Sequence, residues 1–413
     1  MSDAESLFAL LAVVYVIDCA QWAPLDSVVF SAPWGNAFRA RFPHFALGNG
    51  RGALVLANPL PPLGPAAITQ PSPLSFSPEG VAAFPAQTLN THAIGNWTLS
   101  AGKREESGGA FRAWDDVARW SVDDQKILAD GGFFATVNSH ALARRLVKDM
   151  NRIGRLSAES RAAAIERVVE RRCSLTAITR RVRVYEERTR GLRTLCNVFW
   201  CYFFGVGAML VWHSPARRQW AALLAGLVAL MVATIVRFRA TYRKLYPRQR
   251  KRWRGHGLMM LFSPMEAIRA YDLASREAFS EFDPLGVAYA LCPSHELRRI
   301  ARIVVADCEH PVVEQAELDA RAEATVLWYR RRYDARIERM LEEMQLDRRQ
   351  ISAPPQSAGD DCRTYCPRCE TQFSLEEGAC ETCGGIALLP LFPTGSSPSD
   401  VKFLGQESSS VGE

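Results

Sequence analysis

The chain has 413 residues, of which 48% are hydrophobic and 23% are charged, and its formal net charge is +6. This charged fraction excludes a globally disordered chain, and the length suffices for two or three modules. The cysteines exclude a disulfide-rich secreted domain, because only those between residues 362 and 383 cluster.

The first predicted element is a transmembrane helix over residues 6–22. Asp3 and Glu5 precede it, where a cleaved secretory signal would carry basic residues. Arg39 and Arg41 follow it. These charges favour an anchor with its N-terminus outside, and a helix lying in the interface is the alternative.

Two soluble segments are predicted to follow. Residues 24–100 favour a small β-rich subdomain, because Phe38–Phe42 alternates as strands do and Gly48–Gly50 is typical of a turn. Residues 111–193 are predicted to be a cytoplasmic helical segment, with Ser157 capping one helix. The acidic pairs of this segment are expected on a solvated helix face rather than around a cation.

Residues 194–236 predict a transmembrane helical hairpin. Thr194–Trp212 and Trp220–Val236 carry no charged residue, and each is close to the ~20 residues needed to cross a bilayer core. Small residues recur every four positions and favour close packing of the pair or, alternatively, a homo-oligomer; they are Asn197, Cys201, Gly205, Ala221, Ala225, Ala229 and Ala233. Without an ionisable residue in mid-span, an ion pathway is disfavoured.

The charges around this hairpin predict its orientation. Arginines precede it, and the basic juxtamembrane segment 237–254 follows it without an acidic residue, whereas the tip carries only Arg217 and Arg218. Both flanks are therefore expected in the cytoplasm, and 237–254 is expected to contact anionic membrane lipid.

Residues 263–349 predict a cytoplasmic helical domain. Ser263–Glu266 has the pattern of a helix start, and Asp283-Pro284 is expected to break that helix. Ser294 is expected to cap a helix to about Asp307, which would hold Cys292 and Cys308 roughly 20 Å apart and disfavours a second metal site. A long helix is predicted from Pro311 to about Arg349, with a face that packs on its neighbours or forms a short coiled coil.

The most specific motif is a pair of CxxC knuckles separated by ten residues. Two such knuckles direct four thiolates to one point, the tetrahedral arrangement that Zn²⁺ prefers. The predicted ligands are Cys366, Cys369, Cys380 and Cys383, while Cys362 is spare. This segment resembles the rubredoxin-like zinc ribbons over residues 362–390 only, and the usual glycine after the first knuckle is here Glu370. The closed site predicts structural zinc, with iron as the alternative.

The residues around the knuckles indicate what the ribbon binds. Acidic side chains outnumber the two arginines there, which disfavours nucleic acid and favours a protein partner. The tail, residues 393–413, is rich in Ser, Gly and Pro and is expected to be disordered.

The sequence as a whole predicts a mainly α membrane protein of the bacterial inner (plasma) membrane, acting as a scaffold or adaptor rather than an enzyme. A membrane-bound enzyme with a dispersed active site and an oligomeric transporter or channel subunit are the alternatives, although no known catalytic motif is present.

Overall fold

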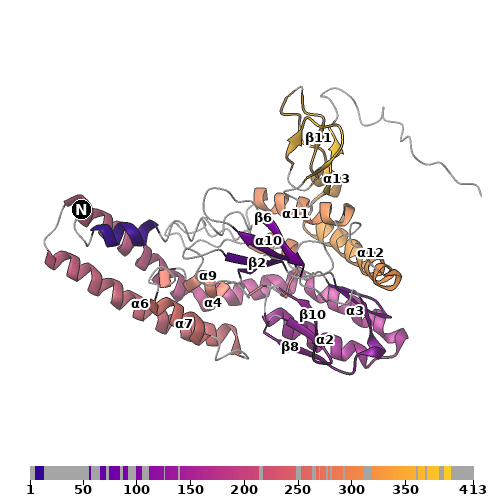
Figure 1. Cartoon of the computed structure of the whole chain (residues 1–413), viewed down its shortest axis with the longest axis horizontal. Coiled ribbons are helices and arrows are strands. Elements are labelled where there is room, and N and C mark those ends of the chain that lie inside the picture. The colour runs from indigo at the N-terminus through magenta and orange to yellow at the C-terminus, as the bar shows by residue number, and fades with distance from the viewer. Residues whose placement is uncertain are drawn as a thin grey trace, which may run out of the picture.

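A computed structural model describes most of the chain (Figure 1). It covers residues 5–13, 55–56, 66–70, 74–83, 87–91, 99–104, 111–124, 126–137, 140–213, 217–247, 253–262, 267–268, 270–275, 278–279, 281–291, 294–310, 319–359, 361–367, 370–380 and 386–391. The structure is mainly helical with small β-sheets and two helices that are candidates for crossing a membrane, as the sequence predicts. The predictions for Phe38–Phe42, Gly48–Gly50, Ser263–Glu266 and the tail 393–413 fall outside the described residues.

The N-terminal strands form two antiparallel sheets. One has the order β1-β2-β5-β6, with β1 at Val55–Leu56, β2 at Ala66–Gln70, β5 at Gln87–Thr91 and β6 at Leu99–Arg104. The other has the order β3-β4-β7, with β3 at Leu74–Phe76, β4 at Gly80–Ala83 and β7 at Phe111–Ala113. This second sheet belongs to the main core of the protein, because Phe76 and Val81 are buried in one cluster with Tyr329 and Ile337 of the C-terminal helices.

Residues 111–136 are strands, so the prediction of helix here was wrong. After a 3-10 turn at Trp114–Asp116, the strands β8 (Trp120–Asp123), β9 (Lys126–Ala129) and β10 (Gly132–Thr136) form a meander. Asp130 and Gly131 join β9 to β10 with φ angles of 48° and 83°. A two-residue turn with positive φ at both positions matches the twist of a hairpin, and Asp-Gly is among its preferred sequences.

One of the next helices begins where the sequence predicts it, after Ser157, although the Ser157 side chain accepts no capping hydrogen bond. Helix α2 spans His140–Gly154 and α3 spans Ala158–Arg172, with Ser157 at the N-cap position of α3. Ile165, Val168 and Val169 are buried. They face the same core as the first sheets, so α3 is held by apolar packing.

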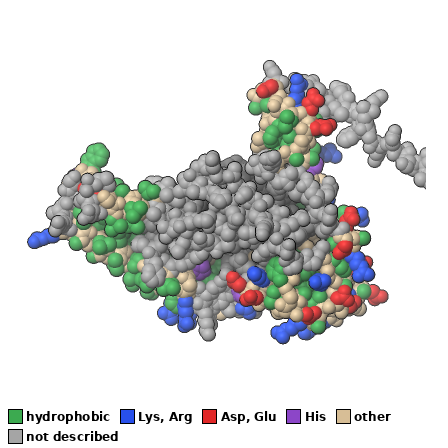
Figure 2. All heavy atoms as spheres, viewed as in Figure 1, with side chains coloured by type: hydrophobic (Ala, Val, Ile, Leu, Met, Phe, Trp, Pro, Cys, Tyr) green, Lys and Arg blue, Asp and Glu red, His purple; other side chains and the backbone are tan. Residues whose placement is uncertain are grey.

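The hairpin is built from two long helices (Figure 1). Helix α4 (Leu175–Trp200) continues through a π-helical turn at Cys201–Val206 into α5 (Gly207–His213), and α6 spans Arg217–Leu245. Only 22% and 28% of their most apolar windows are buried. Hydrophobic side chains cover the surface of the hairpin, whereas charged ones gather on the body built by α2 and α3 (Figure 2).

Large side chains fill the contact between the two hairpin helices. These are Leu192, Phe199 and Phe203 from one helix and Leu223, Leu227, Met231 and Phe238 from the other. The alanines of the four-residue repeat are exposed, as are Cys201 and Gly205. Six of the seven small-residue positions therefore lie on the outer face of the pair, whereas Asn197 is half-buried with its side-chain oxygen enclosed.

Residues 5–13 form a helix that packs against the hairpin near its tip. The ring of Phe8 lies on the backbone of Gly207, 5.0 Å from the ring of Phe203 and 6.5 Å from that of Trp220 between centroids. Gly207 and Trp220 flank the turn between the two hairpin helices. The N-terminal end of the chain and the hairpin tip therefore lie on the same side of this helical bundle.

The remaining helices are α7 (Trp253–Phe262), α9 (Ala270–Ser275), α10 (Pro284–Leu291), α11 (Ser294–Glu309), α12 (Ala320–Glu343) and α13 (Arg348–Ser352). Of these, α7 and α9 pack on the hairpin and the others contribute to the main core. Asp283 accepts a hydrogen bond from the Leu285 amide at 2.9 Å, so Asp283-Pro284 begins α10. The predicted helix from Ser294 is confirmed.

The long C-terminal helix is shorter than predicted. It begins after its cap residue Asp319 and ends at Glu343, where Gln345 adopts a φ of 58° and Asp347 caps α13. A left-handed residue just after a helix ends the helical hydrogen-bond pattern. The predicted apolar face is buried against the chain's own sheet and helices, which excludes the coiled coil for these residues.

Candidate metal centre

The C-terminal module is built from short strands on two hairpins. Strands β12 (Gln372–Phe373), β11 (Thr364–Tyr365) and β15 (Leu389–Pro390) form one sheet, and β13 (Ala379–Cys380) pairs with β14 (Ile386–Ala387). In Figure 1 the module stands beyond α11 and α13, on the part of the molecule remote from the hairpin tip. Strands this short have little apolar surface to bury, so the fold requires another source of stability.

The first knuckle has a tightly closed backbone. The Glu370 amide donates to the Cys366 carbonyl and the Cys366 amide donates to the Thr371 carbonyl, both at 2.9 Å. Glu370 has a φ of 60°. This left-handed conformation strains any residue with a side chain, and it explains why glycine is usual at this position in zinc ribbons. The sequence departs from that pattern while the backbone keeps its conformation.

The second knuckle brings its first cysteine to the same interior. Cys380 pairs with Ile386 across the β13–β14 hairpin, and the Leu388 amide donates to the Gly378 carbonyl at 2.9 Å. Cys366 and Cys380 are both buried in one small cluster, with Phe373 and Leu388 packed against it. The structure therefore brings together one predicted ligand from each knuckle, although they are fourteen positions apart.

The other predicted ligands, Cys369 and Cys383, lie outside the described residues. Within the described part of the chain, no group of three or more ligating side chains is present. Cys362 is only half-buried, and its Sγ lies 4.0 Å from a carboxylate oxygen of Asp361 rather than in the buried cluster. The described donors fit part of a thiolate site for Zn²⁺ or Fe, because two buried cysteines belong to one cluster.

The scattered cysteines form no second centre among the described residues. Cys308 is buried in the main core near the end of α11, and Cys292 lies outside the described residues. Cys173 is buried at the end of α3, and burial raises the pKa of its thiol well above the ordinary value. A buried protonated thiol behaves as a small apolar side chain rather than as a nucleophile or ligand.

The ribbon is joined to the helical body by polar contacts that the sequence did not reveal. The Arg302 guanidinium on α11 lies 3.1 Å from the Glu370 carboxylate and donates to the Ala353 carbonyl at 2.7 Å. The side-chain amide of Gln372 donates to the Gln356 carbonyl at 2.7 Å. These contacts hold the first knuckle against the helices, so the module has a defined position on the body.

The outer loop of the ribbon is acidic with one apolar side chain at its tip. Leu375 is 59% exposed, and Glu376 and Glu377 beside it are exposed as well. The Thr364 hydroxyl donates to the Leu375 carbonyl at 2.8 Å, which fixes the loop on β11. The loop therefore presents one exposed apolar side chain among acidic ones on a fixed backbone.

Comparison with known proteins yields no family. No protein-family model matches the chain, and neither a curated protein nor a solved structure is significantly similar to it. The function must therefore be argued from the residues themselves.

Proposed function

We propose that this chain is an integral protein of a bacterial plasma membrane that holds a zinc ribbon on the cytoplasmic side, where the ribbon binds a protein partner. The observation that carries the proposal is the buried pair Cys366 and Cys380, one from each knuckle. A four-thiolate site leaves no open coordination position, so the zinc is structural and the ribbon acts as a binding surface.

The surface of the hairpin supports membrane insertion. Leu224, Val228, Val232 and Val236 of α6 are each about half exposed or more. A continuous apolar face of this length is unfavourable in water and matches the hydrocarbon core of a bilayer. The contact of Phe8 with Gly207 supports an N-terminus outside, because the hairpin tip is expected there from the positive-inside rule.

The outer loop supports a partner with a basic surface. Leu375 offers an apolar anchor, and Glu376 and Glu377 surround it with negative charge. Burial of such a side chain in an interface contributes to the binding free energy, and the flanking negative charges attract a partner with positive charge. The same charges repel nucleic acid phosphates.

Metal content tests the first half of the proposal. The full chain, purified in detergent, should carry one zinc ion measured by inductively coupled plasma mass spectrometry. Cys366→Ser and Cys380→Ser should each reduce the zinc content severely, whereas Cys362→Ser should leave it unchanged. A metal-free wild-type protein, or equal loss in Cys362→Ser, would contradict the assignment.

Site-specific photocrosslinking in native membranes tests the second half. A photoreactive residue in place of Leu375 should give a discrete crosslinked protein, and charge reversal at Glu376 and Glu377 should abolish it. The matched control is Leu327, which is 43% exposed on α12 and has no acidic loop around it. Equal crosslinking from both positions would refute partner binding by the loop.

A further inference from the structure

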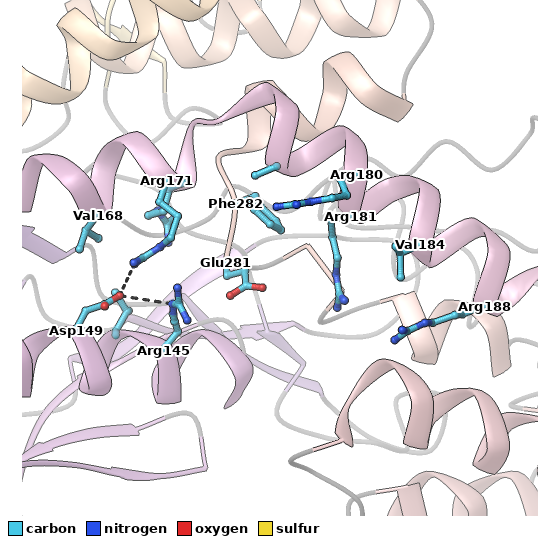
Figure 3. Close-up of a pocket in the computed structure, with 13 residues that line it drawn as sticks. Arg145, Asp149, Val168, Arg171, Arg180, Arg181, Val184, Arg188, Glu281 and Phe282 are labelled. Carbon is cyan, nitrogen blue, oxygen red and sulfur yellow. Dashed lines mark hydrogen bonds and ion pairs between the residues drawn. The ribbon is translucent and has the colours of Figure 1, made fainter.

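Six arginines of the described structure line one cavity. The cavity has a volume of about 430 Å³ and lies between α2, α3, α4 and the segment before α10 (Figure 3). Its walls carry two carboxylates, Asp149 and Glu281, and six arginines: Arg145, Arg171, Arg172, Arg180, Arg181 and Arg188. The lining itself has an excess of four positive charges, one of which, on Arg172, interacts with the buried Asp283 outside the lining.

Asp149 is already shared by several arginines. Arg171 donates to its carboxylate at 2.5 Å, and Arg145 and Arg152 lie 3.7 Å from it. Burial lowers the pKa of the Arg171 guanidinium, Asp149 opposes that shift, and Arg145 adds to it. One carboxylate thus compensates only part of the charge on α2 and α3.

The cavity-lining arginines of α4 add further positive charge, and none of them forms an ion pair with a described carboxylate, although Glu281 lines the same cavity. Arg181 donates to the Ala278 carbonyl at 3.2 Å and Arg188 to the Lys244 carbonyl at 2.7 Å, and both acceptors are uncharged. Arg180 has no hydrogen bond or ion pair to any described residue. Figure 3 shows these three side chains along one helix, with Arg145 and Asp149 of α2 beside Arg171 and Glu281 between Arg145 and Arg181.

One guanidinium nitrogen of the lining has an ionic contact but no hydrogen bond to a described residue, because the Nε of Arg145 lies 3.7 Å from the Asp149 carboxylate. The Nε of Arg145 is buried and makes no hydrogen bond within the described structure. A buried donor on a charged group is costly when it is unpaired. Together with the uncompensated charge, this nitrogen indicates that the cavity is completed by an anion.

We propose that this cavity is a binding site for a phosphate-bearing ligand. Guanidinium groups match phosphate oxygens with paired hydrogen bonds, and a dianionic phosphate uses several such donors at once. The volume lies within the range of small-molecule sites, about 300–1,000 Å³, which favours a compact group over an extended chain.

The place of the cavity in the fold allows two sources for that phosphate. Arg188 and Arg180 precede the apolar stretch at Thr194 by about 9 Å and about 21 Å along the helix axis. Arg188 is thus at the depth of lipid headgroups if the hairpin spans a membrane, while Arg180 reaches further into the cytoplasmic side. An anionic phospholipid headgroup and a soluble organic phosphate share the chemistry, and only the lipid source depends on the proposed membrane insertion.

Two arms of one experiment distinguish these sources. In the first, the full chain in nanodiscs of uncharged phosphatidylcholine is titrated with inorganic pyrophosphate by calorimetry. In the second, the chain is released from nanodiscs that contain phosphatidylglycerol, and native mass spectrometry measures whether one phosphatidylglycerol stays bound. Saturable pyrophosphate binding supports a soluble ligand, and retained phosphatidylglycerol supports a lipid.

Two arginines of α4 give a matched pair of variants. Arg180→Gln removes a lining charge and should weaken binding about tenfold or more in whichever of the two experiments detects binding by the wild-type protein. Arg183→Gln removes an exposed arginine of the same helix that does not line the cavity, and binding should be unchanged. Arg145→Gln provides a second test from the opposite wall. Absence of binding in both arms, or equal weakening in Arg183→Gln, would overturn the proposal.

Discussion

Replacement of Tyr333 by Phe should loosen the helical body through the loss of one buried hydrogen bond. The Tyr333 hydroxyl donates to the Asp283 carboxylate at 2.5 Å, and both residues are buried. A hydrogen bond to a charged group contributes about 1.5–3 kcal/mol, and its loss also leaves the carboxylate oxygen unpaired. This loss corresponds to a roughly 10- to 150-fold rise in the opening equilibrium of α10.

Hydrogen exchange of the purified full chain measures that opening on peptides from α10. The matched control is Tyr329→Phe, one turn earlier on the same helix. Tyr329 is equally buried and has no hydrogen-bond partner among the described residues, so this variant should change the opening free energy by less than about 0.5 kcal/mol. Equal effects of the two variants would refute the argument, because the loss would then come from packing alone.

The same contact predicts a dependence on pH. The hydrogen bond from Tyr333 lowers the pKa of Asp283 against the larger raising effect of burial, so it favours the ionised carboxylate. Tyr333→Phe should therefore cost more stability at neutral pH than at acidic pH, where Asp283 is protonated in both proteins. A constant cost across the titration would contradict the assigned donor and acceptor.

Three further predictions concern single positions. Burial raises the pKa of Asp283, so the wild-type opening free energy should fall as pH rises from the ordinary aspartate pKa through the pKa of Asp283 in the folded protein. Hydrogen exchange of Asp283→Asn should show no such dependence on pH. Glu370 has a φ of 60°, which glycine adopts without strain and alanine does not. Both Glu370→Gly and Glu370→Ala lose the contact with Arg302, so the opening free energy of the ribbon in the same assay should be higher for Glu370→Gly by up to about 1 kcal/mol. Gly207→Leu should displace Phe8 and speed exchange over residues 5–13, whereas Gly205→Leu, next to open space, should not.

The motifs that the sequence revealed are those set by local chemistry. The helix from Ser294 and the apolar face of α12 follow from periodicity and capping, which depend on neighbours three or four positions away. The apolar length of the hairpin and the spacing of the cysteines are equally local, and the structure places Cys366 and Cys380 in one buried cluster.

The errors arose where tertiary contacts override local preference. Residues 111–136 have acidic pairs that suit a solvated helix, yet Trp120, Ile127 and Phe134 are buried as strands of a meander. Likewise, the alanine stripe of α6 suggests the inner seam, but the larger Leu223 and Leu227 fill it. Which face of a helix turns inward depends on the shape of its partner, and a single sequence does not contain that information.

The arginine-lined cavity shows the same division most clearly. From the sequence alone, the arginines before the hairpin predict only the orientation of the hairpin in a membrane. Their type and number are known, but their neighbours in space are not. The fold brings Arg145, Arg180 and Glu281 to one cavity although they are distant along the chain. The sequence by itself determined the apolar helical hairpin and the spacing of the cysteine motif, because each is a pattern within a short segment. Only the tertiary structure decided where positive charge accumulates, because that depends on which helices pack together.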